Sequence, residues 1–455
     1  MKMFERVVRK ALVAHLEENA MIPEGQHGFR ARRSCLTQLL TYWDAILDKM
    51  EDGSSVDSVY TDFAKAFDKC ETGVLLQRLK ECGVRDKVGI WLAAFLDSAV
   101  RQQAVGVDGC LSDLVAVISG VPQGTVLGPC LFLVHLMGIF SSVSADTHLS
   151  SFADDTRLLR GVRSTEDCEL LQADLQKVYM WAEEIGMKFN SKKFEVLRFS
   201  SNKDGAPDFS YLAPDGGFIE EKKHLRDLGV RVASDLSFNV QIDSAIVVAT
   251  QMAGWVLRSF RTRARHLMLV MLRTIIQPRL DYCCVLWSPR DQTSINRIEK
   301  VQKDFIGRIC DSSLQGKNYW EKIEELGILS QERRRERQQI CFVWKVSQGL
   351  VDGYSLEWSH SDRRGRTAVP KAIKNSAPSK VKKAREHSFP VHGVRLFNLL
   401  PAYLRNEDSA DFDLFKNHLD IFLSSIPDQP TVPGLGRQAA TNSLLDQIPI
   451  HENLF

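Results

Sequence analysis

An acidic pair at the turn of an expected β-hairpin constrains the fold of this chain more than any other feature of its sequence. Residues 148–159, HLSSFADDTRLL, indicate a strand, a tight turn and a second strand, with Asp154 and Asp155 at the turn. Another expected strand, residues 54–63, has a third carboxylate, Asp62, near its end. If these strands are neighbours in one sheet, the three carboxylates converge. Such a group favours a hard divalent cation such as Mg²⁺, because that ion prefers oxygen ligands.

Each of these features also suits a structural role when it stands alone. Adjacent aspartates are common in turns, and an aspartate between a strand and a helix is often an N-cap. The loop between the two segments, SGVPQGTVLGPCLFL at residues 119–133, is open to both interpretations. Its glycines allow a ligand to approach the backbone closely, and Gln123 offers a donor and an acceptor. A plain connection between a strand and a helix would have the same composition.

The order of the expected elements divides the 455-residue chain into a mixed part and a helical part. Strand and helix patterns alternate up to about residues 235–240, and they include a helix expected over residues 165–185 with Ser164 or Thr165 as its N-cap. Beyond that boundary, apolar residues recur at helical spacing. The pattern therefore predicts an α+β part followed by a mostly helical part.

Charge is distributed unevenly along the chain. Residues 251–400 contain 28 basic and 14 acidic side chains, a net charge of +14, whereas the segments on either side are acidic. This asymmetry favours a polyanionic partner such as nucleic acid, and solvated helix faces are the alternative. The ten cysteines form no C-x-x-C pair, and the sequence has no signal-peptide core. We expect an intracellular protein that does not span a membrane, with nucleus and cytoplasm both open as compartments.

Five motifs follow one another along the chain: DFAKAFD at 62–68, GVPQGTVLGP at 120–129, FADD at 152–155, NSKK at 190–193 and HLRDLGV at 224–230. Taken in order, they resemble the motifs of reverse transcriptases, most closely those of the non-LTR, LINE-type enzymes of jockey-like retrotransposons. An earlier segment, QHGFRARRSCLTQLL, resembles the fingers of the same enzymes.

The resemblance implies a right-hand polymerase. Residues 1–237 would form truncated fingers and a palm with an antiparallel sheet, residues 238–350 a helical thumb-like region, and residues 351–455 a basic helical C-terminal extension with a poorly ordered tail. The implied activity is that of an RNA-directed DNA polymerase, which adds dNTPs to a primer 3′-hydroxyl with two Mg²⁺ ions, or Mn²⁺ in their place. The implied partners are an RNA template, a DNA primer or nicked target DNA, and dNTPs, whereas protein partners stay open.

The resemblance also implies roles for single residues. Asp62 matches the first metal-binding aspartate, and Asp154 and Asp155 match the paired aspartates of the turn. The backbone carbonyl of Phe63 would be a further metal ligand. Phe67 matches a steric gate, an aromatic ring that clashes with a ribose 2′-hydroxyl and so favours dNTPs. A core aromatic on a short helix is the alternative for Phe67.

Further positions match by motif and have ordinary alternatives as well. Gln123 and Gly124 would line the floor under the template and the incoming base. Lys193 matches the lysine that protonates the leaving pyrophosphate, and it would otherwise be a solvated lysine. Arg30 and Arg32 would hold the triphosphate or template through charge-assisted hydrogen bonds, or they are surface charges.

Three basic clusters in the helical part would fit a nucleic-acid track. Such clusters bind phosphates without reading sequence, although neighbouring glutamates such as Glu332 and Glu336 could neutralise one of them. The residues expected in the track are Arg258, Arg261, Arg263, Arg333, Arg334, Arg335, Lys382 and Lys383.

The sequence also departs from the family pattern. It leaves no room for an endonuclease domain ahead of the polymerase, and the first fingers segment is missing. Where the family has V-D-H after the DFAKAFD motif, this chain has Cys70, Glu71 and Thr72. We therefore expect a copy truncated at its N-terminus, whose activity is open. The main alternative is a catalytically inactive remnant that still binds RNA; an intron-encoded maturase and a domesticated interaction protein are further alternatives.

Overall fold

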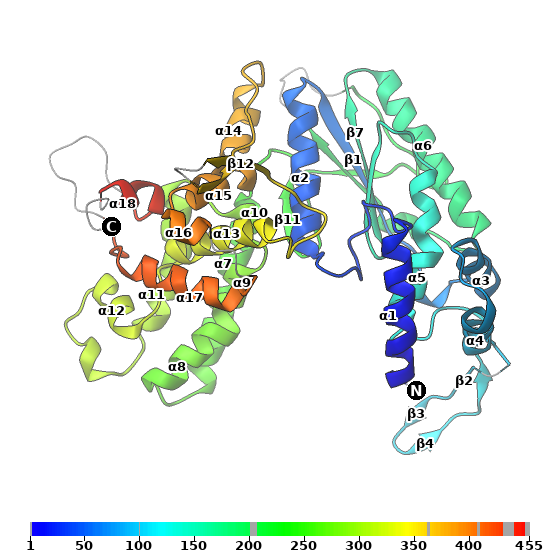
Figure 1. Ribbon diagram of the computed structural model, residues 1–455, viewed down its shortest axis with the longest axis horizontal. Helices are drawn as coiled ribbons and strands as arrows, with labels where there is room; N and C mark the ends of the chain where they lie inside the picture. The colour runs from blue at the N-terminus through cyan, green and yellow to red at the C-terminus, as the bar shows by residue number, and fades with distance from the viewer. Residues whose placement is uncertain are drawn as a thin grey trace. The chain divides into compact units, whose positions relative to one another are not determined.

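The computed structural model describes residues 2–99, 101–200, 207–361, 365–406, 410–430 and 441–450. The chain divides into two compact units (Figure 1). Unit 1 comprises Met1–Gln38 and Tyr42–Lys223, and unit 2 comprises Leu39–Thr41 and His224–Phe455.

The division falls before the boundary expected at residue 237. A hairpin of β10 (His224–Asp227) and β11 (Val230–Ala233) packs against α7 (Asn239–Ser259) and therefore belongs to unit 2. The regions expected to be separate at 238–350 and 351–455 lie in this same unit.

Unit 1 is built around a five-stranded sheet in the order β6-β7-β1-β8-β9. All neighbouring strands are antiparallel except β8 and β9, which are parallel. The expected antiparallel sheet is therefore present, with one parallel pair at this edge. A long connection between β8 and β9 allows the parallel pairing, which a tight hairpin would not. The strands are β1 (Ser55–Thr61), β6 (His148–Phe152), β7 (Asp155–Val162), β8 (Glu195–Phe199) and β9 (Glu220–Lys222).

The two faces of this sheet have different neighbours. Alternate residues of a strand point to opposite faces. On one face Ser58 accepts a hydrogen bond from Tyr42 of α2, and on the other Asp57 accepts from Arg198 and Tyr211. The helices of unit 1 are α1 (Lys2–Glu18), α2 (Cys35–Glu51), α3 (Thr72–Glu81), α4 (Asp86–Leu96), α5 (Gly128–Leu136) and α6 (Thr165–Glu184).

Helix α6 confirms the helix expected over residues 165–185. Ser164 is its N-cap, and Ser164 and Asp167 form a reciprocal capping box that satisfies backbone donors at the start of the helix. Leu171, Leu175 and Val178 are fully buried in the core of unit 1. Between α4 and α5, four two-residue strands form paired ribbons: β2 (Gln102–Gln103) with β5 (Val115–Ala116), and β3 (Gly106–Val107) with β4 (Cys110–Leu111).

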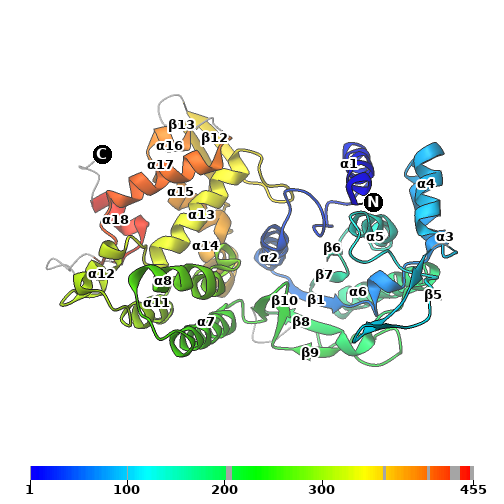
Figure 2. The same ribbon diagram turned by 90° about the horizontal axis from the view of Figure 1, so that it is seen from below.

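Unit 2 is mostly helical, as expected, and Figure 2 shows α13 among its neighbours. Helix α13 (Gln331–Ser347) packs against α10, α11 and α15, and it buries residues on more than one side. A hairpin of β12 (Glu357–Ser361) and β13 (Gly365–Val369) was not expected. The other helices are α8 (Arg265–Met271), α9 (Gln277–Asp281), α10 (Cys284–Trp287), α11 (Gln292–Ile306), α12 (Tyr319–Leu326), α14 (Ser379–His387), α15 (Phe389–Asn398), α16 (Ala402–Arg405), α17 (Phe412–Ser424) and α18 (Leu444–Ile450).

The expected poorly ordered tail is packed where the structure describes it. Leu444 is fully buried, and the carboxylate of Glu336 on α13 accepts hydrogen bonds from Ser443 and from the backbone of Leu444. Residues 431–440 and 451–455 of that tail lie outside the described residues.

Helix α7 is the one described helix that is long and apolar enough to cross a membrane by length and composition. It packs against α9, α11 and β11. We therefore interpret it as a core helix of unit 2.

Candidate active site

Three acidic residues lie at one end of the central strands of unit 1. Thr61 of β1 pairs with Thr156 of β7, so Asp62, one residue further, comes opposite Asp155. Asp155 pairs with Phe152 across the tight turn that contains Asp154. The register of the sheet thus joins two segments that are more than 90 residues apart in the sequence.

The electrostatics of the acidic residues agree with this placement. Burial raises the pKa of Asp154, and the nearby charge of Asp62 raises it further. Burial also raises the pKa of Asp155, and both other carboxylates add to that shift, whereas Arg157 opposes it. Since like charges raise one another's pKa only at short range, the three carboxylates are close enough to interact.

Lys193 pairs directly with one of the three carboxylates. Its Nζ lies 3.0 Å from Oδ2 of Asp62, and this hydrogen bond raises the pKa of the Lys193 ammonium. The side chain of Lys193 is 61% exposed. Lys193 lies in η3 (Ser191–Lys193), just before β8. The structure therefore brings the lysine of NSKK next to the acidic residues.

The carboxylate oxygens of Asp62, Asp154 and Asp155 are suitable ligands for a divalent cation. The three side chains are not, however, arranged around a common metal position. Within the described ranges, no three His, Cys, Asp or Glu side chains lie close enough together to hold a metal ion. Oδ2 of Asp62 is instead paired with Nζ of Lys193. Asp62 would have to exchange Lys193 for a metal, and the expected shared metal site therefore stays a prediction.

The hydrogen bonds on either side of Phe63 indicate the direction in which its backbone carbonyl points. The backbone N–H of Ala64 donates to Lys188, and that of Asn190 donates to the carbonyl of Asp62. Phe63 forms an antiparallel bridge with Phe189 between these two bonds. Successive carbonyls of an extended chain alternate in direction, so the Phe63 carbonyl points away from Phe189, toward the β7 side.

Phe67 lies in η1 (Ala66–Asp68) and is half-buried. Its ring stacks on Phe132 with centroids 4.2 Å apart, and it meets Phe29 edge-on at 6.0 Å. These contacts fix the ring, which suits a core aromatic. They equally suit a gate, because a steric gate has to be rigid.

The loop that contains Gln123 and precedes α5, called the Gln123 loop below, is held against the turn that follows Asp62. Gln123 donates from Nε2 to Oδ1 of Asp68 at 2.7 Å, and Ser119 donates to the backbone carbonyl of Asp68 at 2.8 Å. Gly120 has a φ of +85°, and a Cβ there would lie 2.8 Å from the Phe67 carbonyl oxygen. This close approach requires glycine. Asp68 was not among the site residues expected from the sequence, although it is the second aspartate of DFAKAFD.

Gly124 is exposed and has a φ of +72°, with open space where a Cβ would point. The need for glycine here comes from the backbone conformation. The open space leaves a ligand able to approach this backbone, as the sequence suggested.

The fingers arginines differ in their environments. Arg30 has a largely buried side chain, lies 2.5 Å from Glu17 and donates to backbone carbonyls of its own loop, among them Pro23 at 2.9 Å. These bonds give Arg30 a structural role in the loop. Arg32 is exposed, with a φ of +57°. That Arg30 or Arg32 holds the nucleotide or the template stays a prediction.

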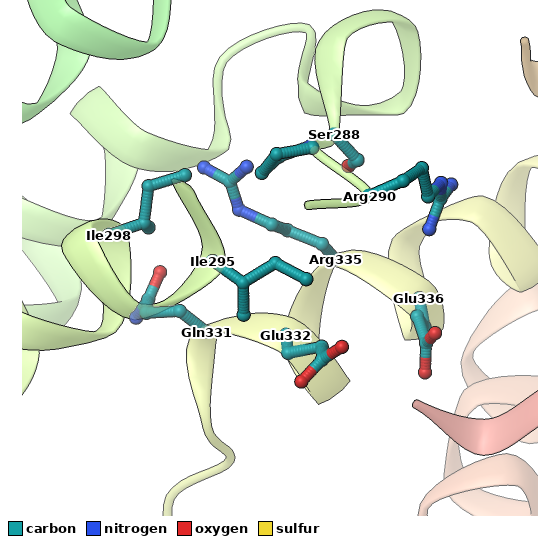
Figure 3. A pocket seen from close by; sticks show the side chains of 9 residues that line it. Ser288, Arg290, Ile295, Ile298, Gln331, Glu332, Arg335 and Glu336 are labelled. Atoms are coloured by element: carbon teal, nitrogen blue, oxygen red, sulfur yellow. The ribbon is translucent and has the colours of Figure 1, made fainter. Parts of the chain in front are cut away.

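The basic cluster at the start of α13 is directed inward, so the prediction that Arg333 and Arg335 bind nucleic acid is wrong. Arg333 is fully buried and donates to the backbone carbonyls of Ile426 and Pro427. The guanidinium of Arg335 lies 4.3 Å from the ring centroid of Trp287. Arg335 is 3% exposed, and Figure 3 shows its side chain among those that line a pocket.

The other residues of the expected track are mixed. Arg334 makes an ion pair with Asp281 at 2.6 Å, and Arg263 donates to backbone carbonyls at the end of α7. Lys382 donates to the backbone of Asn375 at 2.6 Å. The side chains that are exposed and so accessible to a phosphate backbone are Arg258, Arg261 and Lys383.

An α+β unit with acidic residues at neighbouring strand ends and a glycine-rich loop beside them has the architecture of a polymerase palm. A sequence model of the reverse transcriptase (RNA-dependent DNA polymerase) family matches residues 1–232. The chain belongs to this family.

Curated relatives are polymerases of insect mobile elements. The chain is 25% identical over 318 residues to the RNA-directed DNA polymerase from mobile element jockey of Drosophila melanogaster, which covers 68% of this chain and 34% of that protein. It is 26% identical over 309 residues to the probable RNA-directed DNA polymerase from transposon X-element of the same species, covering 66% and 33%. The chain thus spans about a third of the length of these relatives.

Among solved structures, apo telomerase from Candida tropicalis aligns with 92% of this chain and 59% of that chain, at 11% identity and a TM-score of 0.42. Telomerase from Candida albicans in complex with a telomeric RNA fragment aligns with 71% of this chain and 58% of that chain, at 13% identity and a TM-score of 0.38.

Proposed function

We propose that this chain is an RNA-directed DNA polymerase of a non-LTR retrotransposon, which extends a DNA primer along an RNA template. Family membership supports the activity, and the jockey-like relatives support the type of element. The observation that carries the proposal is the strand register that sets Asp62 beside Asp155 and the Asp154 turn.

The acidic residues would hold the divalent ions that reverse transcriptases generally use. Asp62, Asp154 and Asp155 would supply carboxylate ligands, and Phe63 a backbone carbonyl. When bound, such ions lower the pKa of the attacking hydroxyl and stabilise charge on the triphosphate. The two ions would be Mg²⁺, with Mn²⁺ as a substitute.

The chain's own side chains would then position substrate and move a proton. Lys193, released from Asp62, would donate a proton from Nζ to the leaving pyrophosphate. The ring of Phe67 would exclude a ribose 2′-hydroxyl, and Gln123 and Gly124 would support the template and the incoming base. Most of the rate gain would come from positioning and from fixed charges.

A primer-extension assay on poly(rA)/oligo(dT) with Mg²⁺ tests the proposal. Asp154→Asn keeps the shape of the side chain and removes a metal ligand worth several kcal/mol, so incorporation should fall by about 100-fold or more. Asp108→Asn is the matched control: Asp108 is exposed in the β3–β4 turn, and its φ of +49° suits asparagine.

Activity that survives in Asp154→Asn would refute the proposed site. The alternative function, an inactive remnant that binds RNA, predicts tight RNA binding with no incorporation by the wild-type chain.

A further inference from the structure

Phe29, on the loop that precedes α2, combines a strained backbone with a partly exposed ring. Its φ is +60°, and the residue is 42% exposed. A left-handed backbone destabilises a residue that has a Cβ, and a ring left partly in water offsets that cost less than a buried ring would. Packing alone is therefore a weak reason for a phenylalanine here. Backbone strain of this kind is concentrated at functional sites.

Hydrogen bonds hold this loop against the turn that contains Asp154. Oε1 of Gln26 accepts from the backbone N–H of Gly28 at 3.0 Å and from that of Ala153 at 3.1 Å. A Cβ on Gly28 would overlap the backbone nitrogen of Ala153, so glycine is required for the two segments to approach this closely. Phe29 is the next residue of the loop, and its position is therefore tied to that of the acidic turn.

Phe29 is also one of two rings that contact the ring of Phe67 in different orientations. The centroids of Phe29 and Phe67 are 6.0 Å apart with the ring planes at 87°, an edge-on contact. Phe132, which is fully buried, stacks on Phe67 at 4.2 Å with the planes at 17°. Stacked rings can slide past one another in parallel, whereas a third ring at right angles opposes such sliding. The edge-on contact with Phe29 therefore adds a restraint that Phe132 does not supply.

We propose that Phe29 is a positioning residue for sugar selection, which acts through Phe67 by holding that ring where it excludes a ribose 2′-hydroxyl. The inference rests on the proposed function, because Phe67 is the gate of that site. A steric gate discriminates only while its ring is in place, so selection against rNTPs follows the equilibrium between the placed and the displaced ring. One edge-on contact between rings shifts such an equilibrium by about two- to twelvefold.

The test is primer extension by the full chain on poly(rA)/oligo(dT), with kcat/KM measured for dUTP and for UTP, which differ only in the 2′-hydroxyl. Phe29→Gly removes the ring and suits the positive φ, so the preference for dUTP over UTP should fall about two- to twelvefold. Phe29→Tyr keeps the ring and should keep the preference.

The ratio of the two efficiencies separates positioning of Phe67 from a merely structural role. General destabilisation lowers both efficiencies together and leaves their ratio unchanged. An unchanged ratio in Phe29→Gly therefore overturns the proposal, and so does a ratio that falls equally in Phe29→Gly and Phe29→Tyr. If Phe29→Gly does not fold, Phe29→Asn is measured in its place, since asparagine also tolerates a positive φ.

Phe4→Ala is the matched control. Phe4 of α1 is 53% exposed, and its ring meets that of Trp91 edge-on with centroids 5.1 Å apart. The substitution removes an exposed edge-on ring of unit 1 that does not contact Phe67, and it should leave the dUTP/UTP ratio unchanged. A ratio that falls as far in Phe4→Ala as in Phe29→Gly would contradict a specific role for Phe29.

Phe67→Ala in the same assay separates this inference from the proposed function. A lower ratio in Phe67→Ala, with an unchanged ratio in Phe29→Gly, refutes only the role of Phe29. Equal ratios for the wild type and Phe67→Ala refute the proposed gate, and the inference falls with it. A wild-type chain that extends no primer refutes both.

Discussion

Replacing Gly120 with alanine tests whether the Gln123 loop must approach the turn after Asp62 as closely as described. Gly120 has a φ of +85°, and its Cβ would lie 2.8 Å from the Phe67 carbonyl oxygen and from the Asp68 Cα. Both neighbours are backbone, so relief requires a shift of the chain. Gly124 is the matched control, because it also has a positive φ but open space around its Cβ.

The two substitutions separate backbone strain from steric clash. A positive φ costs a non-glycine residue about 1–2 kcal/mol, and both variants bear this cost. The clash adds about 1–3 kcal/mol in Gly120→Ala alone. At about 2–4 °C per kcal/mol for a unit of this size, Gly124→Ala should lower the melting temperature of unit 1 by about 2–8 °C, and Gly120→Ala by about 4–20 °C.

Thermal unfolding of both purified variants, followed by circular dichroism, measures these shifts. Primer extension by Gly120→Ala should also fall, because Phe67 and Asp68 move with the turn. Equal melting temperatures for the two variants would refute the close approach on which the argument rests.

Three further predictions concern other parts of the chain. Arg333→Ala should destabilise unit 2 by about 2–4 kcal/mol and leave the salt dependence of RNA binding unchanged. Arg261→Ala should leave stability unchanged and reduce the slope of the log binding constant against log salt concentration by about 1. Filter binding at several salt concentrations separates the two variants. Asp68→Ala should raise the KM for dNTP more than it lowers kcat, since Asp68 holds Gln123, and equal changes in both would contradict this role. Burial, followed by the charge of Glu336, raises the pKa of Glu332 to about 8, so the native state binds a proton that the unfolded chain has released above pH 4.5. Stability of unit 2 should therefore fall as pH rises from about 4.5 to about 8, and an unaltered pH profile in Glu332→Gln would show that another group is responsible.

The features that the sequence predicted correctly depend on local pattern. The strand that ends near Asp62 and the hairpin with Asp154 and Asp155 at its turn follow from alternation and from turn-forming residues. The start of α6 follows from Ser164 and the residues after it, because a capping box is local. That the two acidic segments are neighbours was a hypothesis, and only pairing across the sheet could decide it.

The features that the sequence did not predict depend on distant partners. The run of arginines in α13 has the composition of a solvated face, but the helix is surrounded, and Arg333 is buried against carbonyls more than 90 residues away. The same helix contains the large apolar residues Ile340, Val343 and Trp344, which indicated that it packs in the core of unit 2. The bond between Gln123 and Asp68 joins residues 55 positions apart, and no periodicity in the sequence reports such a contact.

The proposed polymerase site requires that Asp62, Asp154 and Asp155 share divalent ions. Crystals of the full chain with Mn²⁺, a primer–template duplex and a non-hydrolysable dNTP would locate the ions directly by anomalous scattering. We predict anomalous peaks bound by all three carboxylates, with Lys193 displaced from Asp62. A structure in which the Lys193–Asp62 pair persists and no peak lies between residues 62 and 155 would contradict it.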